Sequence, residues 1–122
     1  MGIFHTECVI SNLTNRDRTE KLPKVLVDSG SEYTWIPEPI LEKLGVKQEK
    51  KDVSFLMANG QTITRSIGFA IIRAGEFFTT DEVVFAAPGD PQLLGARTLE
   101  GMGVVPDPRH KKLVAAGPIP AA

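Results

Sequence analysis

The feature of this sequence that most limits its fold is a series of short apolar runs, separated by turn-forming residues at spacings of roughly ten. Such spacing is typical of a β-sandwich or barrel. Helix is expected only near 37–44, where prolines precede an apolar face and Gly45 follows, and as a turn near 97–102. We therefore predict an all-β fold with one or two short helices, and expect strands at 3–10, 23–27, 53–57, 62–73, 77–86, 92–94 and 113–115.

Two local patterns refine this expectation. Val25, Leu26 and Val27 are consecutive apolar residues, as in a strand buried on both faces. Asn59-Gly60 lies between two strand candidates and favours a type I′ hairpin turn, in which both residues have positive φ. Gly75 marks a second hairpin.

The length favours a single domain. A chain of 122 residues with 42% apolar and 24% charged residues is typical of one globular domain with a modest core. The single cysteine, Cys8, cannot form a disulfide within the chain. We expect one domain over 1–116 and a flexible C-terminal tail over 117–122.

Charge and composition argue against several classes of partner. The net charge is −1, from 14 basic and 15 acidic side chains, so nucleic acid is not an expected partner. No apolar stretch is long enough to span a membrane, so we expect no membrane partner and, by default, a cytoplasmic protein. His5 and His110 lack the spacing of metal ligands, so no metal site is expected.

The most informative segment is 25–36, where an apolar strand ends in Asp28-Ser29-Gly30 and apolar residues then resume. An ionised carboxylate between buried runs needs hydrogen-bond donors or a partner charge. Ser29 and the local backbone supply donors, and Gly30 permits close approach. Taken alone, the tripeptide is more typical of an ordinary β-turn, in which Asp, Ser and Gly supply turn chemistry.

Leu26-Val27-Asp28-Ser29-Gly30-Ser31 resembles the active-site strand and loop of retropepsin-like aspartic proteases. Later in the chain, Gln92-Leu93-Leu94-Gly95 resembles the apolar-apolar-glycine element that packs beside that loop. The turn-bearing segment 57–63 lies between them, where the family carries its flap. The resemblance covers about 10–102 and implies a single-lobe, pepsin-like closed barrel with a flap hairpin.

The resemblance also implies roles for individual residues. Asp28 is similar to the catalytic aspartate, Ser29 to the hydroxyl residue that bonds between the two active-site loops, and Gly30 to the glycine that lets those loops meet. Leu93, Leu94 and Gly95 match the structural motif. Implied substrate contacts are Ser31, Glu32, Phe55, Met57, Asn59, Gly60, Ile63, Ala87, Pro88 and Leu93.

This chain departs from the family where Glu32 follows the small residue and Ala96-Arg97 follows the late glycine. Many members have Asp and Arg directly at these places. The family's usual ion pair between these places is then shifted or absent. Either Glu32 and Arg97 form an ion pair in its place, or they are two unrelated surface charges.

The implied function is that of an aspartic endopeptidase, in which each subunit of a homodimer contributes one Asp28. One carboxylate accepts a proton from water while the other, still protonated, polarises the scissile carbonyl. The substrate would be an extended peptide or protein segment, and no cofactor is implied. Two other interpretations remain, a peptide- or ligand-binding module that does not cut, and an unrelated small β-barrel.

Overall fold

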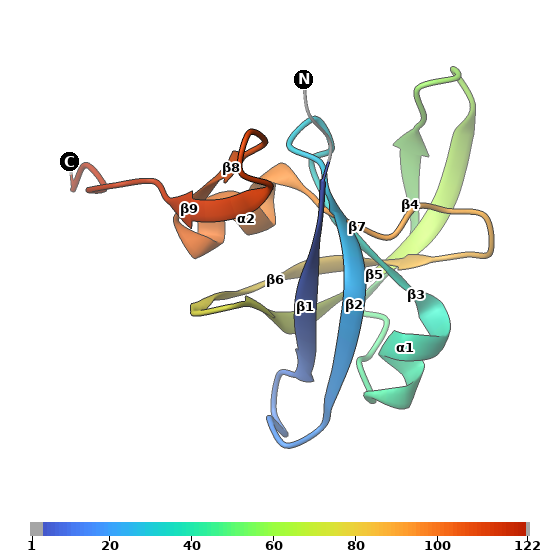
Figure 1. Cartoon of the computed structure of the whole chain (residues 1–122). Helices are drawn as coiled ribbons and strands as arrows, with labels where there is room; N and C mark the ends of the chain where they lie inside the picture. Colours follow the sequence, from blue (N-terminus) through green and yellow to red (C-terminus); the bar gives the residue numbers. More distant parts are fainter. Residues whose placement is uncertain (1–3, 122) are drawn as a thin grey trace.

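Residues 4–121 fold mainly into β-strands, with two short helices (Figure 1). The computed structural model describes residues 4–121. The elements in chain order are β1 (Phe4–Asn12), β2 (Thr19–Val27), β3 (Thr34–Pro37), α1 (Glu38–Lys43), β4 (Lys50–Leu56), β5 (Thr62–Ala74), β6 (Phe77–Ala86), β7 (Leu93–Leu94), α2 (Ala96–Met102), β8 (Val104–Asp107) and β9 (Lys112–Ala115).

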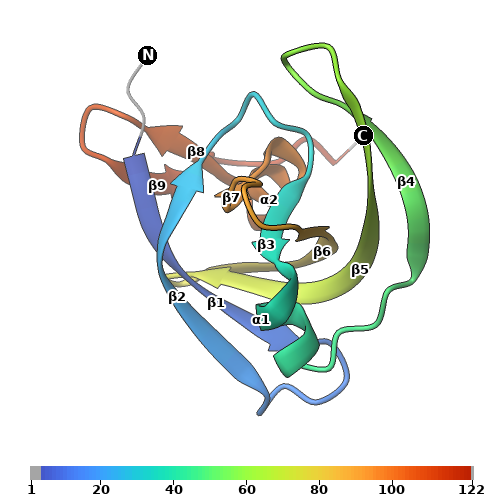
Figure 2. The same cartoon turned by 90° about the vertical axis from the view of Figure 1, so that its right-hand side faces the viewer.

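One sheet closes on itself to form the barrel. Its strand order is β1-β2-β7-β3-β6-β5-β4, and an additional antiparallel pairing of β1 with β5 closes the ring. Among residues 4–121, β4 pairs only with β5 and lies outside the ring, so the β4–β5 hairpin extends beyond the barrel (Figure 2). β8 and β9 form a separate two-stranded sheet. The all-β, single-lobe barrel expected from the sequence is confirmed.

The interior of the ring holds the main core. Alternate residues of β1 and β2 point inward, and α1 adds the fully buried Leu41 from below. Each large aliphatic side chain removed from water contributes roughly 1.5–3 kcal/mol before entropy is counted. The buried residues at the centre of this cluster include Cys8, Ile10, Val25, Ile36, Ile72, Val83 and Leu94.

Helix α1 shows how local sequence sets an element's ends. Pro39 occupies the first turn, where its missing N–H costs nothing, and Glu38 lies at the positive end of the helix dipole. At the other end Gly45 has φ +74°, and its N–H donates to the Glu42 carbonyl while Val46 N–H donates to the Leu41 carbonyl. This is a Schellman ending, as Gly45 predicted.

The first two strands are longer than the sequence predicted. β1 reaches Asn12 and β2 begins at Thr19, so the connection between them is only six residues rather than the twelve left between the strands expected at 3–10 and 23–27. Ile3, expected to begin the first strand, lies outside the described residues. The sequence did not predict β8. This strand pairs with the expected C-terminal strand β9, with Val104 opposite Ala115 and Asp107 opposite Lys112.

The turn type predicted at Asn59-Gly60 was wrong. Gly60 has φ +86°, but Asn59 does not have positive φ. Gly60 N–H donates to the Met57 carbonyl (2.9 Å) and Met57 N–H to the Gln61 carbonyl (2.8 Å). This pattern is a type I turn followed by a left-handed glycine, in which only the glycine needs positive φ. The loop has one residue more than a type I′ turn, because the bond between Met57 and Gln61 leaves three residues, 58–60, between them.

Among residues 4–121, no helix has the length and apolar character needed to cross a membrane.

Candidate active site

Asp28 directly follows β2, at the point where three strands meet. The short strand β7 lies between β2 and β3, parallel to the first and antiparallel to the second. Asp28 N–H donates to the Leu94 carbonyl (3.0 Å), so the backbone of the loop is tied to β7 as it leaves the sheet. The carboxylate is therefore carried on a rigid base at one end of the barrel.

The loop after Asp28 turns back on the carboxylate. Gly30 N–H donates to Asp28 Oδ1 (3.0 Å), and Ser31 N–H donates to the Asp28 carbonyl (3.2 Å). A Cβ on residue 30 would lie 3.2 Å from Oδ1, so glycine suits this close approach. No described residue donates a hydrogen bond to Asp28 Oδ2. One carboxylate oxygen is thus held in place while the other remains available.

Gly95 anchors the other side of the loop. A Cβ there would overlap the Tyr33 carbonyl group, so only glycine allows this contact between backbones. Gly95 N–H donates to Thr34 Oγ1 (3.0 Å), Thr34 Oγ1 lies 2.5 Å from Thr98 Oγ1, and Thr98 donates to Asp81 Oδ2 (2.9 Å). Both threonines are fully buried. This chain of hydrogen bonds joins β3, α2 and β6 beneath the Asp28 loop.

A cleft of about 380 Å³ opens beside Asp28, within the size range of small-ligand and peptide pockets. Of the predicted site residues, the structure brings Asp28, Gly30, Ser31, Glu32, Phe55, Met57 and Leu93 to its walls. The prediction missed Tyr33, Trp35, Leu56 and Ala58, which line it together with Pro91. The alternation of Tyr33 and Trp35 along one face of a strand was a signal that could have identified two of them.

Aromatic packing connects the β4–β5 hairpin to the floor of the cleft. The Phe55 ring lies edge-on to Tyr33, with centroids 5.7 Å apart, and tilted against Trp35 at 5.1 Å. Ile63, opposite Phe55 on the hairpin, packs on the same apolar cluster without lining the cleft. These contacts make the cleft wall mainly apolar, with the carboxylates of Asp28 and Glu32 at its polar side.

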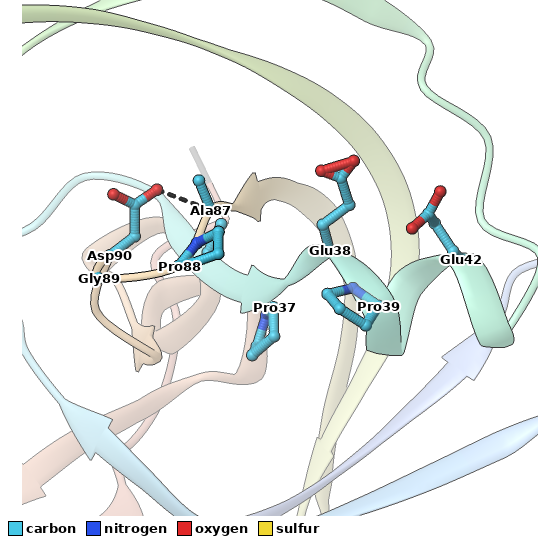
Figure 3. Close-up of a pocket in the computed structure, with 9 residues that line it drawn as sticks. Pro37, Glu38, Pro39, Glu42, Ala87, Pro88, Gly89 and Asp90 are labelled. Atoms are coloured by element: carbon cyan, nitrogen blue, oxygen red, sulfur yellow. Dashed lines mark hydrogen bonds between the residues drawn. The ribbon is translucent and has the colours of Figure 1, made fainter.

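Other predicted site residues lie elsewhere. Ser29 is exposed beside Asp28, and Asn59 and Gly60 are at the exposed tip of the hairpin, outside the lining of this cleft. Ala87 and Pro88 line a different hollow of about 510 Å³, between their loop and helix α1 (Figure 3). Only Pro91, at the end of that loop, reaches the cleft beside Asp28.

Of the two alternatives for Glu32 and Arg97, the ion pair is not formed between these described residues. The Arg97 guanidinium instead bonds to Glu82 (3.2 Å) and stacks over the Tyr33 ring at 4.8 Å. Helix α2 directs the Arg97 side chain toward β6, and only its backbone N–H donates to the Glu32 carbonyl (3.2 Å). Burial raises the pKa of Glu82, but the hydrogen bond from Lys50 and the two cations outweigh it and hold that pKa below its ordinary value.

Neither metal chemistry nor a thiol nucleophile has support in the described residues. Across residues 4–121 no three His, Cys, Asp or Glu side chains gather as metal ligands. Burial, with a smaller effect of the Glu7 charge, raises the pKa of the Cys8 thiol to about 12. Such a thiol is not ionised near neutral pH and behaves as a small core side chain.

Comparison with protein-family models matches residues 20–101, about two thirds of the chain, to the family described as gag-polyprotein putative aspartyl protease. No curated protein matches the sequence. The matched segment contains the Asp28 loop, the β4–β5 hairpin and Gly95, which are the features that build the cleft. The chain therefore belongs to the gag-polyprotein aspartyl protease family, with its retropepsin-like fold.

Proposed function

We propose that the protein is an aspartic endopeptidase that works as a homodimer, with Asp28 of each subunit in one shared site. The observation that carries the proposal is the hydrogen bonding of the two Asp28 carboxylate oxygens. One oxygen is oriented by Gly30 N–H, while the other has no described donor and borders an apolar cleft. A carboxylate that is positioned but not neutralised, beside a peptide-sized cleft, suits general acid–base chemistry.

A single Asp28 is insufficient for that chemistry. Aspartic proteases are the standard example of two neighbouring carboxyl groups that share one proton, because two adjacent negative charges are unfavourable. The ionised member takes a proton from water, and the protonated member polarises the carbonyl of the scissile bond. Since each chain has one Asp-Ser-Gly sequence, a second copy supplies the second carboxylate. No metal or organic cofactor takes part in this scheme.

Open strand edges support the dimer. β5 pairs only with Val9–Asn12 of β1, so one edge of β1 from Phe4 to Cys8 has no partner among residues 4–121. In the same described part, β9 pairs only with β8. Exposed edges of this kind readily pair with another chain. We propose that these terminal segments pair across a twofold axis and bring the two Asp28 loops together.

The substrate we propose is an extended peptide with apolar side chains. Strand-like hydrogen bonds would hold its backbone beneath the flap, and Tyr33, Trp35, Phe55 and Leu93 would contact its side chains. The exposed tip at Asn59-Gly60 would close over the peptide and exclude water, which would explain why it does not line the open cleft.

The test measures mass and activity on the same samples. Sedimentation across a range of protein concentrations should show a monomer–dimer equilibrium, and hydrolysis of a peptide library should follow the dimer fraction. Hydrolysis that is proportional to total protein, in samples that contain only monomer, would defeat the proposal. Peptide binding without hydrolysis by a stable dimer would instead identify a binding module.

A further inference from the structure

The base of the flap hairpin is bonded to the loop that forms one wall of the cleft. Arg65 lies on β5, opposite Val53 of β4. Its Nε donates to Asp90 Oδ2 (2.6 Å), and its Nη2 donates to Asp90 Oδ1 (3.0 Å). The Arg65 and Asp90 side chains are 22% and 10% exposed. A forked pair shielded from water is stronger and more directional than an exposed ion pair.

Asp90 also shapes its own loop. Its Oδ2 accepts a hydrogen bond from Ala87 N–H (2.7 Å), drawn in Figure 3, and its backbone N–H donates to the Ala87 carbonyl (2.9 Å). Pro88 followed by Gly89 at φ +90° is the pattern of a type II turn. Pro91, which lines the cleft, comes next in the chain. One carboxylate therefore determines both the turn and its attachment to the flap strand.

Strand β4, the other strand of the hairpin, is irregular beside Val53, the residue opposite Arg65. The pairing of β4 with β5 shifts between Lys50 and Val53, and Asp52 there has φ +55°. Bulges of this kind bend a strand locally. Beyond this level the hairpin carries Phe55 and Met57 into the cleft. The flap thus has a bend in β4 and an anchor at Arg65 in β5, directly across from each other.

We propose that Arg65 is a positioning residue that, through Asp90, couples the flap hairpin to the 87–91 loop, so that the flap and the cleft wall move together. The coupling is a property of the free protein. Its consequence for catalysis rests on the proposed function, because Pro91 and Phe55 would contact the same peptide. Loss of the link should weaken peptide binding more than the chemical step, and so raise KM more than it lowers kcat.

Hydrogen exchange of the free protein tests the coupling without relying on hydrolysis. In Arg65→Gln we expect the amides of Ala87 and Asp90 in the loop, and of Met57 and Gly60 in the flap, to exchange about tenfold faster. Amides between β1 and β2 should be unchanged. The matched control is Lys50→Gln, which removes the Lys50–Glu82 ion pair from the same hairpin without touching the loop. Faster exchange in the loop alone, in the flap alone, or equally in Lys50→Gln would overturn the coupling.

Conservative variants separate positioning from general stability. Arg65→Lys keeps the charge but not the fork, so its exchange rates should lie between wild type and Arg65→Gln. Asp90→Asn keeps an acceptor for Ala87 N–H and serves in place of Arg65→Gln if that variant does not fold.

With peptide substrate, we expect KM to rise about tenfold in Arg65→Gln and to recover in part in Arg65→Lys. If the wild type hydrolyses nothing, the proposed function fails while the exchange result still decides the coupling. If the Arg65→Gln enzyme is active and its KM equals that of wild type, the proposed effect of the coupling on peptide binding is contradicted.

Discussion

The buried hydrogen-bond chain beneath the Asp28 loop gives a specific prediction for Thr98→Val. A carboxylate only accepts hydrogen bonds, so the Thr98 hydroxyl proton is committed to Asp81. Thr34 must then donate its own proton to Thr98 and accept from Gly95 N–H. Valine has nearly the shape of threonine but lacks the hydroxyl. The substitution therefore removes the hydrogen bonds of Thr98 to Thr34 and to Asp81, with little change in side-chain volume.

The expected cost follows from what is left unpaired. The Thr34 hydroxyl, fully buried, loses its acceptor, which costs roughly 1–3 kcal/mol, and Asp81 loses one donor, a charged hydrogen bond of roughly 1.5–3 kcal/mol. Because the exposed side of Asp81 can regain water, we expect a total loss of about 3 kcal/mol. This is a large part of the roughly 5–15 kcal/mol that stabilises a domain.

Urea unfolding of wild type, Thr98→Val and Thr98→Ser measures this loss. The midpoint should fall sharply in Thr98→Val with an unchanged m-value. Thr98→Ser keeps the hydroxyl and loses one methyl group, so it should lose only about 1 kcal/mol. Equal stabilities for Thr98→Val and wild type, or a greater loss in Thr98→Ser than in Thr98→Val, would refute the contribution assigned to these hydrogen bonds.

Three further predictions concern the flap, the core and the Asp90 link. Gly60→Val places a β-branched residue at φ +86°, so peptide hydrolysis should fall more than the urea midpoint does. Cys8, with its thiol pKa raised to about 12, should resist alkylation near pH 8 in the native state and react quickly in urea. The hydrogen bonds from Arg65 hold the pKa of Asp90 below its ordinary value, so the stability that Asp90 provides over Asp90→Asn should be complete above roughly pH 4 and decline as pH falls further.

Each of these has a result that would count against it. Equal losses of activity and stability in Gly60→Val would make the hairpin tip a scaffold rather than a lid, and Gly75→Val, at the other hairpin, is the matched control. Native-state labelling of Cys8 at the rate seen in urea would show an open core. A stability difference between wild type and Asp90→Asn that grows toward acid pH would reverse the sign deduced for Asp90.

The sequence predicted the parts of the site that depend on local chemistry. Asp28, Gly30 and Gly95 were named as site residues because Leu26–Ser31 and Gln92–Gly95 resemble two motifs of retropepsin-like proteases, whereas Asp28-Ser29-Gly30 alone was also compatible with an ordinary turn. The hairpin was placed correctly from Asn59-Gly60, although its turn type was not, since local dipeptide preference does not reveal where strand pairing stops. Ala87 and Pro88 were assigned to the substrate cleft but line the neighbouring hollow.

Contacts between distant residues were not predictable in the same way. Thr34 and Thr98 are ordinary threonines in sequence, and they meet only because β7 brings β3 and α2 together. Arg65 and Asp90 likewise carry no motif that links them. For Arg97 the sequence left open whether Glu32 was its partner and did not suggest Glu82, because the direction of a side chain on α2 is set by the packing of that helix against β6.

The central claim is that Asp28 performs the chemistry, and the most direct test compares peptide hydrolysis by wild type and Asp28→Asn. Asparagine retains the size of the side chain and an oxygen that can accept from Gly30 N–H, but it cannot take a proton from water. We expect hydrolysis to fall by about a thousandfold or more, while folding and dimer mass are preserved. The wild-type rate should show a bell-shaped dependence on pH, whose limbs belong to the carboxyl pair. Undiminished hydrolysis by folded Asp28→Asn protein would contradict the account.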